Sequence, residues 1–336
     1  MKSLYSGALS FFALLLTLAP VVAQTARTTI PVGLVKITIP AAPNANTLSS
    51  LAISAPLYGN AVYQGAIVSI DSATTLTLSN ANFTAGQYAA SPYFARIMSG
   101  TSVGRFFLIT TNSINQLTVD TAGADLTTLL SPGDIAQIVP ANTLGSLFGA
   151  TAPGFVTGIS ANTADNVFLW IGGTWEVYYN DGTHWHAAGS LNPNLDATII
   201  YPDEGVFISH RSTTSPLVLH LAGTVPSTPE QSDLPGAGST LLPNRFPVDV
   251  QLINIGLQNS PNWKSGITAS QADNVYVWST ASETWNLFYY NGTHWRESGS
   301  LIPNLDATII PAGTSVFVTR ANTTPAFVTQ PLPYTP

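Results

Sequence analysis

The stretch that decides the fold occurs twice in the chain. Residues 164–200 read ADNVFLWIGGTWEVYYNDGTHWHAAGSLNPNLDATII, and residues 272–310 read ADNVYVWSTASETWNLFYYNGTHWRESGSLIPNLDATII. In both copies, short runs rich in Val, Tyr and Trp are separated by Gly- and Asn-containing turns, which is the pattern of antiparallel strands. Asn, Asp and Gly tolerate positive φ, so they predict tight hairpins between these runs. The duplication therefore indicates two related β modules.

The similarity extends beyond these stretches and sets the expected domain boundaries. Matching positions such as Leu144 and Leu252 extend the copies to residues 140–222 and 248–336. Residues 223–247 between them are rich in Pro, Gly and Ser, which predicts a linker or a long loop. Two copies are too few for a solenoid or a propeller. We therefore expect a pair of modules that share one fold.

The residues before the first copy also have the periodicity of strands. Runs such as 28–39 and 61–70 alternate apolar and polar residues and are bounded by turn signals. Helical periodicity is nearly absent, with a single candidate turn at 124–130. Residues 24–139 are therefore predicted to form an N-terminal β-barrel or β-sandwich domain, and the chain as a whole is predicted to be all-β.

Residues 1–23 have the composition of a secretory signal peptide. Lys2 precedes a short apolar run, and the small residues that end at Ala23 resemble a cleavage site. The apolar run is too short to cross a bilayer comfortably, although an uncleaved anchor is the alternative. The sequence thus predicts an exported protein with no membrane span after signal removal, in the periplasm, at the cell surface or outside the cell.

The composition excludes several functional classes. Only 8% of the residues are charged and the formal net charge is −7, whereas ordinary domains carry roughly a quarter of charged residues. Scarce Lys and Arg argue against a nucleic-acid partner, because phosphates require a basic face. The chain contains no Cys, so it forms neither disulfides nor thiolate metal sites. No cofactor and no metal are predicted.

A series of motifs follows in a fixed order along the chain. They are SGxxxGRFFxI at 99–109, LTVDTAGxDLT at 117–127, GDxxxIVP at 133–140, TLGSLFG at 143–149 and TADNVxxW at 163–170. Together with the strand-like residues 31–40, this order resembles a family of exported bacterial all-β proteins of unknown function. The resemblance implies export and an all-β fold. The family carries no known activity, so no functional residues are transferred from it.

Four aromatic positions recur in both copies and are candidates for a glycan-binding platform, because exposed Trp and Tyr rings stack on the apolar faces of sugars. They are Trp170/Trp278, Trp175/Trp285, Tyr179/Tyr289 and Trp185/Trp295. We expect Trp170 and Trp175 in the module core, and Trp185, which follows a turn, is the better candidate for exposure. The alternative for Trp185 and Trp295 is packing in each core, which their identical surroundings favour.

His184 and His294 recur at one site and complete the candidate ligand-binding set. A His beside a carboxylate can act as a general base or a metal ligand. His184 lies near Asp181, but the second copy has Asn291 at that position. We therefore predict that these histidines occupy turns and form hydrogen bonds with the backbone.

The carboxylates that recur in both copies are predicted to stabilise turns or strand ends rather than to act in catalysis. Asp165/Asp273 and Asp196/Asp306 each stand beside Asn or near Pro-Asn, where a turn or strand-start cap explains them. No Gly-rich phosphate loop is present, and no catalytic residue is assigned.

The sequence therefore predicts an exported non-enzymatic β-protein with a structural or surface-binding role. Its expected partner is a glycan or another cell-surface component. The alternative is a pair of carbohydrate-binding modules, or a glycan-processing enzyme whose site has no recognised motif. The oligomeric state stays open.

Overall fold

The regular secondary structure of the polypeptide is almost all β-strand, which confirms the predicted fold class. The computed structural model describes residues 30–335, so the predicted signal peptide at 1–23 lies outside the described residues. Within 30–335, helical structure is confined to short segments. These are α1 (Leu126–Leu129), α2 (Leu144–Phe148), and the 3-10 turns η1 (Leu252–Ile255), η2 (Leu257–Asn259) and η3 (Ala269–Gln271).

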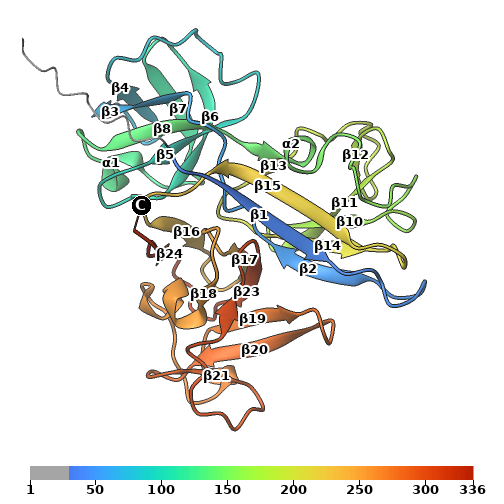
Figure 1. The fold of residues 1–336 in the computed structure, drawn as a ribbon. Helices are drawn as coiled ribbons and strands as arrows, with labels where there is room; N and C mark the ends of the chain where they lie inside the picture. The colour runs from blue at the N-terminus through green and yellow to red at the C-terminus, as the bar shows by residue number, and fades with distance from the viewer. Residues whose placement is uncertain (1–29, 336) are drawn as a thin grey trace, which may run out of the picture. The chain divides into compact units, whose positions relative to one another are not determined.

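Six strands close into a barrel in the order β3-β4-β7-β6-β5-β8 (Figure 1). They are β3 (Tyr63–Ile70), β4 (Thr75–Leu78), β5 (Tyr93–Ile97), β6 (Phe106–Asn112), β7 (Gln116–Asp120) and β8 (Ile135–Pro140). Alternate residues face inward; on β4, Leu76 and Leu78 are buried while the two threonines are partly exposed. Closure leaves no unpaired edge in this sheet.

The first module contains a five-stranded sheet in the order β12-β11-β10-β14-β2, and two further strand pairs, β1 with β15 and β9 with β13. Its strands are β1 (Val32–Ile39), β2 (Ser49–Ile53), β9 (Asn142–Thr143), β10 (Asn166–Ile171), β11 (Thr174–Asn180), β12 (Trp185–Ala187), β13 (Ile199–Ile200), β14 (Val206–His210) and β15 (Leu217–Thr224). All of the pairings are antiparallel.

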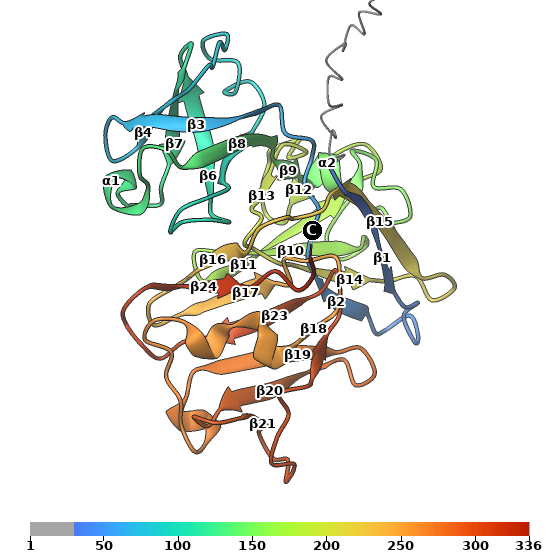
Figure 2. The ribbon, with the colours of Figure 1, turned by 60° about the vertical axis from the view of Figure 1, so that its left-hand side comes forward.

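The second module repeats this arrangement. Its five-stranded sheet has the order β17-β23-β19-β20-β21 (Figure 2), and its extra pairs are β16 with β24 and β18 with β22. Its strands are β16 (Glu230–Leu234), β17 (Ser239–Pro243), β18 (Val250–Gln251), β19 (Asn274–Ser279), β20 (Thr284–Tyr290), β21 (Trp295–Glu297), β22 (Ile309–Ile310), β23 (Ser315–Thr319) and β24 (Ala326–Gln330). Read in chain order, the two sheets and their extra strand pairs have the same strand order.

The barrel is inserted into the first module. Strands β1 and β2 precede the barrel and β9 follows it, yet all three pair with strands of the first module. At the corresponding point of the second module, only residues 244–249 separate β17 from β18. The predicted boundary of an N-terminal domain at 24–139 is therefore wrong. The first module is discontinuous in sequence because its first two strands come from this segment.

The predicted linker at 223–247 is also wrong. This segment contains β16 and β17, which pair with β24 and β23. Its Pro and Gly residues suggested a loop, but Pro243 ends β17, an edge strand of its sheet. An edge position tolerates Pro because one side of the strand forms no ladder hydrogen bonds. The second module therefore begins at residue 230 rather than at 248.

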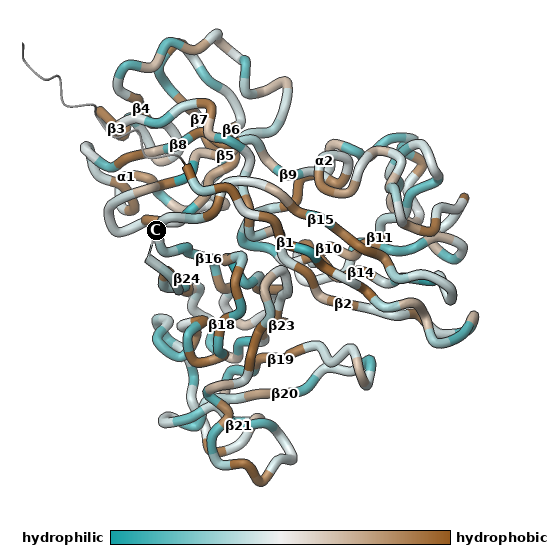
Figure 3. Tube along the Cα trace, in the orientation of Figure 1, coloured by the Kyte–Doolittle hydropathy of each residue, from teal (hydrophilic) through white to brown (hydrophobic). Residues whose placement is uncertain are grey.

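Trp185 and Trp295 occupy the cores of the two modules, with a relative exposure of 0% each. The ring of Trp185 lies 5.8 Å from that of Phe148 and 5.5 Å from that of Phe155, measured between centroids. Trp185 is thus not exposed, and the core role that the identical surroundings favour for both residues is confirmed. Figure 3 shows how hydrophobic residues concentrate on strands such as β15 and β23.

Candidate functional site

The candidate site lies on the outer faces of the two five-stranded sheets. On β10, Val167 and Leu169 point into the core of the first module, so Phe168 and Trp170 point outward. On β11, Tyr178 is buried in the same core, so Trp175 and Tyr179 point outward beside them. The second module follows the same alternation. Each module therefore presents aromatic side chains on the face opposite its core.

Aromatic rings from both modules interleave where these outer faces meet. The ring centroids of Trp170 and Phe317 are 5.0 Å apart, and those of Trp278 and Phe207 are also 5.0 Å apart. Both pairs are edge-to-face, the favoured arrangement of aromatic quadrupoles. Because Trp170 is matched by Trp278 and Phe207 by Phe317, the contacts are reciprocal, as expected for a local two-fold relation.

The two indole nitrogens add reciprocal hydrogen bonds at this junction. Trp170 Nε1 donates to the carbonyl oxygen of Ser239 over 2.7 Å, and Trp278 Nε1 donates to that of Ser50 over 2.7 Å. Each bond links one module to the second strand of the other. The expectation that Trp170 belongs to a module core is corrected accordingly, since it packs between the modules.

A cavity of about 140 Å³ opens beside this junction and is called the aromatic cleft below. Its lining consists of Phe168, Trp175 and Phe207 from the first module and Trp285 from the second. Trp175 is 37% exposed, so the expectation that it lies in the core is wrong. Partly exposed rings that form a concave wall can stack on a flat apolar ligand face.

The outward face continues from the cleft along β11 and β20. Tyr179 stands four residues beyond Trp175, and its ring stacks on that of His186, with centroids 5.5 Å apart. In the second module Tyr289 pairs across the strands with Arg296. Tyr179 and Tyr289, both candidates from the sequence, thus share a face with the cleft, whereas Trp185 and Trp295 do not.

His184 and His294 have a different partner from the one predicted. His184 Nδ1 lies 2.8 Å from Asp196 Oδ2, and His294 Nδ1 lies 2.8 Å from Asp306 Oδ2. The carboxylate partner is therefore retained in both copies, and the prediction of backbone bonding by these rings is wrong. The loop that carries Asp196 is 12 residues away in sequence, too far for the turn pattern to reveal.

Asp196 and Asp306 also fix the core tryptophans. Asp196 Oδ1 accepts the backbone N–H of Trp185 at 2.9 Å, and Asp306 Oδ1 accepts that of Trp295 at 2.8 Å. Each carboxylate thereby ties a surface loop to the start of a strand. This double use supports a structural role for the His–Asp pairs.

The other repeated carboxylates, Asp165 and Asp273, are fully buried. Asp165 accepts the N–H groups of Val156 and Arg211 and contacts the ring of His210. Burial lowers the pKa of His210, but the contacts of its ring with Asp165 and with the carbonyl oxygen of Ser215 outweigh this effect and raise the pKa above its usual value. The side chains join the start of the central strand to loops, so the predicted structural interpretation holds.

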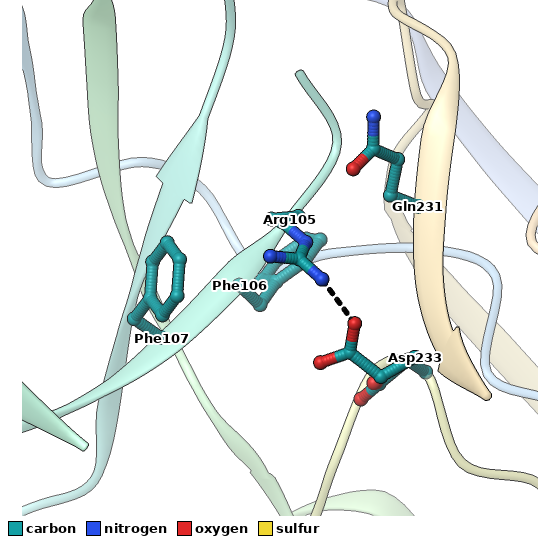
Figure 4. Close-up of a pocket in the computed structure, with 6 residues that line it drawn as sticks. Arg105, Phe106, Phe107, Gln231 and Asp233 are labelled. Atoms are coloured by element: carbon teal, nitrogen blue, oxygen red, sulfur yellow. Dashed lines mark hydrogen bonds and ion pairs between the residues drawn. The ribbon is translucent and has the colours of Figure 1, made fainter. Parts of the chain in front are cut away.

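A second, charged pocket lies where β6 of the barrel approaches β16 (Figure 4). Arg105 forms an ion pair with Asp233 there, and Gln231 and Asp203 complete the polar wall. The cavity measures only about 20 Å³, which is room for about one water molecule. Burial raises the pKa of Asp203, and burial together with Asp203 raises the pKa of Glu204 to about 8.

Behind this pocket, a buried ionic network joins the barrel to the second module. Glu230 of β16 contacts Arg96 of β5 and Arg245, and Tyr58 donates to it over 3.0 Å. All four side chains are buried. Because both arginines pair with the same buried carboxylate, the network holds the barrel and the second module together and leaves no charge free for a ligand.

Within residues 30–335, no group of three or more His, Asp and Glu side chains has a metal-binding arrangement. No helix in this part of the chain is long and apolar enough to cross a membrane. Comparisons with protein-family models, curated proteins and solved structures give no match to this chain.

Sequence reasoning missed Phe168 and Phe207 as lining residues. The repeat offers a signal for Phe207, since Phe317 stands at the matching position, but Phe168 is replaced by Tyr276. Aromatic residues on buried strands are normally assigned to the core. Phe168 points outward because Val167 and Leu169 on either side of it fill the core, and Phe207 pairs with Phe168 across the strands and shares that face.

Proposed function

We propose that this protein is an exported, non-enzymatic β-scaffold that binds a glycan in the aromatic cleft. The observation that carries the proposal is the all-aromatic lining, with rings from both modules around one cavity. Sugar rings present apolar C–H faces that stack on such side chains. Export rests on the signal-like residues 1–23 and on the resemblance to exported bacterial all-β proteins.

The arrangement of charges favours binding over catalysis. Glycoside hydrolysis uses two carboxyl groups that flank the scissile bond, and the four residues that line the cleft are all aromatic. Asp203 and Asp233 line the charged pocket instead, where Arg105 neutralises Asp233 and the space is about 20 Å³. A sugar ring does not fit there. A glycan-processing enzyme is therefore the weaker candidate.

Intrinsic tryptophan fluorescence provides the test, because Trp175 and Trp285 both line the cleft. Neutral oligosaccharides of several linkages are titrated into the full protein, and calorimetry gives the affinities. We expect Trp285→Ala to weaken binding at least about tenfold, the loss of roughly 1.4 kcal/mol of stacking. Leu191→Ala, a fully exposed apolar residue outside the cleft lining, should bind normally.

Two results would refute the proposal. One is a complete lack of binding across the oligosaccharide panel. The other is binding that survives both Trp175→Ala and Trp285→Ala in folded protein, since the ligand would then lie elsewhere.

A further inference from the structure

The two modules differ in charge at the same point of their outer faces. In the first module, His186 pairs across the strands with Tyr179, and its Nε2 lies 3.1 Å from Asp181 Oδ2. In the second module, Arg296 pairs with Tyr289 at the matching position. The carboxylate is absent there, because Asn291 stands where the first module has Asp181.

The Asp-to-Asn difference is not required by the turn itself. Asp181 Oδ1 accepts the backbone N–H groups of Thr183 and His184 in the first module. Asn291 Oδ1 accepts those of Thr293 and His294 in the second, over 2.9 Å and 2.8 Å. Both side chains stabilise the turn equally well, as expected for Asx-turns. The change therefore alters the charge beside Arg296 and leaves the backbone as it was.

Arg296 consequently has no carboxylate partner among the described residues. Its Nε is buried and has no hydrogen-bond partner in this part of the chain. By contrast, Arg96 and Arg245 both form ion pairs with Glu230, and Arg105 forms one with Asp233. A half-buried guanidinium without a carboxylate partner favours an anionic ligand, because charge-assisted hydrogen bonds are the strong ones.

The side chain of Arg296 lies on the same face of its sheet as the aromatic cleft. Trp295 points into the core, so Arg296 points to the outer face, together with Tyr289. Tyr289 lies four residues beyond Trp285 on β20, which corresponds to about 13 Å along a strand. A ligand that reaches from the cleft to Arg296 must therefore be longer than one sugar ring.

We propose that the ligand of the cleft is an acidic oligosaccharide whose anionic group is bound by Arg296. This inference rests on the proposed glycan-binding function and names its ligand class. The sugar rings stack on Trp285 and Tyr289, and the guanidinium forms the charged contact at the end of the second module. The first module gives no such contact, because the matching position holds His186 beside Asp181, whose carboxylate repels an anion. The ligand therefore binds in one orientation despite the two-fold relation of the modules.

The test uses the full protein and pairs of oligosaccharides of equal length and linkage. One member of each pair carries hydroxymethyl groups at C6 and the other carboxylates, as in β-1,4-glucan and β-1,4-glucuronan hexasaccharides. A sulfated hexasaccharide distinguishes a sulfate from a carboxylate ligand. We expect the wild type to bind an acidic member about tenfold more tightly than the neutral one, and added salt to reduce this preference.

Two variants separate the inference from the function on which it rests. Arg296→Gln should abolish the preference for the acidic member and leave neutral binding intact. Asn291→Asp, which supplies the carboxylate of the first module without changing the turn, should do the same. An acidic preference that persists in both variants, or equal wild-type affinities for both members, overturns the inference while the aromatic cleft stands. If neither member binds, the proposed function fails and the inference with it.

Discussion

The Nε1 of Trp185 donates a hydrogen bond to the carbonyl oxygen of Gly149 over 2.8 Å. Trp295, the matching residue of the second module, is equally buried, but its Nε1 has no hydrogen-bond partner among the described residues. The two modules thus fill the same core position with the same side chain and satisfy its polar atom differently. An unpaired buried donor costs free energy comparable to a lost hydrogen bond.

This difference predicts unequal effects of Trp→Phe. Trp185→Phe should lower the free energy of unfolding by about 0.5–1.5 kcal/mol more than Trp295→Phe, because only Trp185→Phe removes a hydrogen bond, while the Gly149 carbonyl keeps its bond from the Ala152 N–H. Thermal and urea unfolding of both variants measure the difference. Trp→Ala at either site should cost about 3–5 kcal/mol, since each ring is fully enclosed. Equal losses for the two Trp→Phe variants would contradict the assignment.

Asp196 and Asp306 should be equivalent in their effect on stability. Each accepts one backbone N–H from a buried Trp and contacts one His ring. Asp196→Ala and Asp306→Ala should therefore each cost about 1–3 kcal/mol, because a donor at the core is left unpaired. Asn at either position retains one acceptor and should cost less. Chemical unfolding curves give the comparison, and a neutral Ala variant would show that water replaces the carboxylate.

The duplicated core could be predicted from the sequence, because the repeat preserves both the strand-forming residues and the turns. The insertion of the barrel could not. The strand β1 pairs with β15, from Val32 opposite Thr224 to Ile39 opposite Leu217, across the whole barrel. Its sequence, VGLVKITI, shares no motif with EQSDL of β16, which holds the same place in the second module. Pairing over such a separation leaves no local signal in the chain.

The candidate site was predicted only in part, for a related reason. On β11, Trp175, Val177 and Tyr179 alternate with Glu176 and Tyr178, so both faces of the strand carry large side chains. A period of two separates the faces but does not say which one is buried. Tyr179, a candidate because it is repeated, lies on the outward face, and its role in ligand binding stays a prediction. The turn before Trp185 made it a candidate for exposure, but its identical surroundings in both copies favoured the core, where it lies.

The stability of the protein should depend on pH through Glu204. Its carboxyl pKa is raised from 4.5 to about 8 by burial and by Asp203, so the folded state binds the proton more tightly than the unfolded state. The free energy of unfolding should then fall as the pH rises from about 4.5 to 8, and level off above that range. Asp203 and His210, whose pKa values are also raised, act in the same direction.

Melting temperatures measured between pH 5 and 9 check this prediction. Glu204→Gln should flatten most of the slope, because the amide mimics the protonated acid, and the remainder should come from Asp203 and His210. The variant should also be more stable than the wild type above pH 8. A wild-type melting temperature that rises over this range would contradict the assigned direction of the pKa change.

The barrel should be removable, since it donates no strand to either five-stranded sheet. Tyr63 on its first strand and Ile138 on its last are directly paired, so the two crossings of the chain lie together, as at sites that tolerate insertion. Replacing residues 60–140 with a short Gly-Ser linker should leave both modules folded, because Glu230 keeps Arg245 and Tyr58. The melting temperature should fall, since the contact of Arg96 with Glu230 is lost.

Deleting residues 31–57 is the matched control. This deletion removes β1 and β2, which pair with β15 and β14, and should unfold the first module. Circular dichroism and oligosaccharide binding report the outcome; loss of the β spectrum on removal of the barrel alone would show that the modules require it to fold.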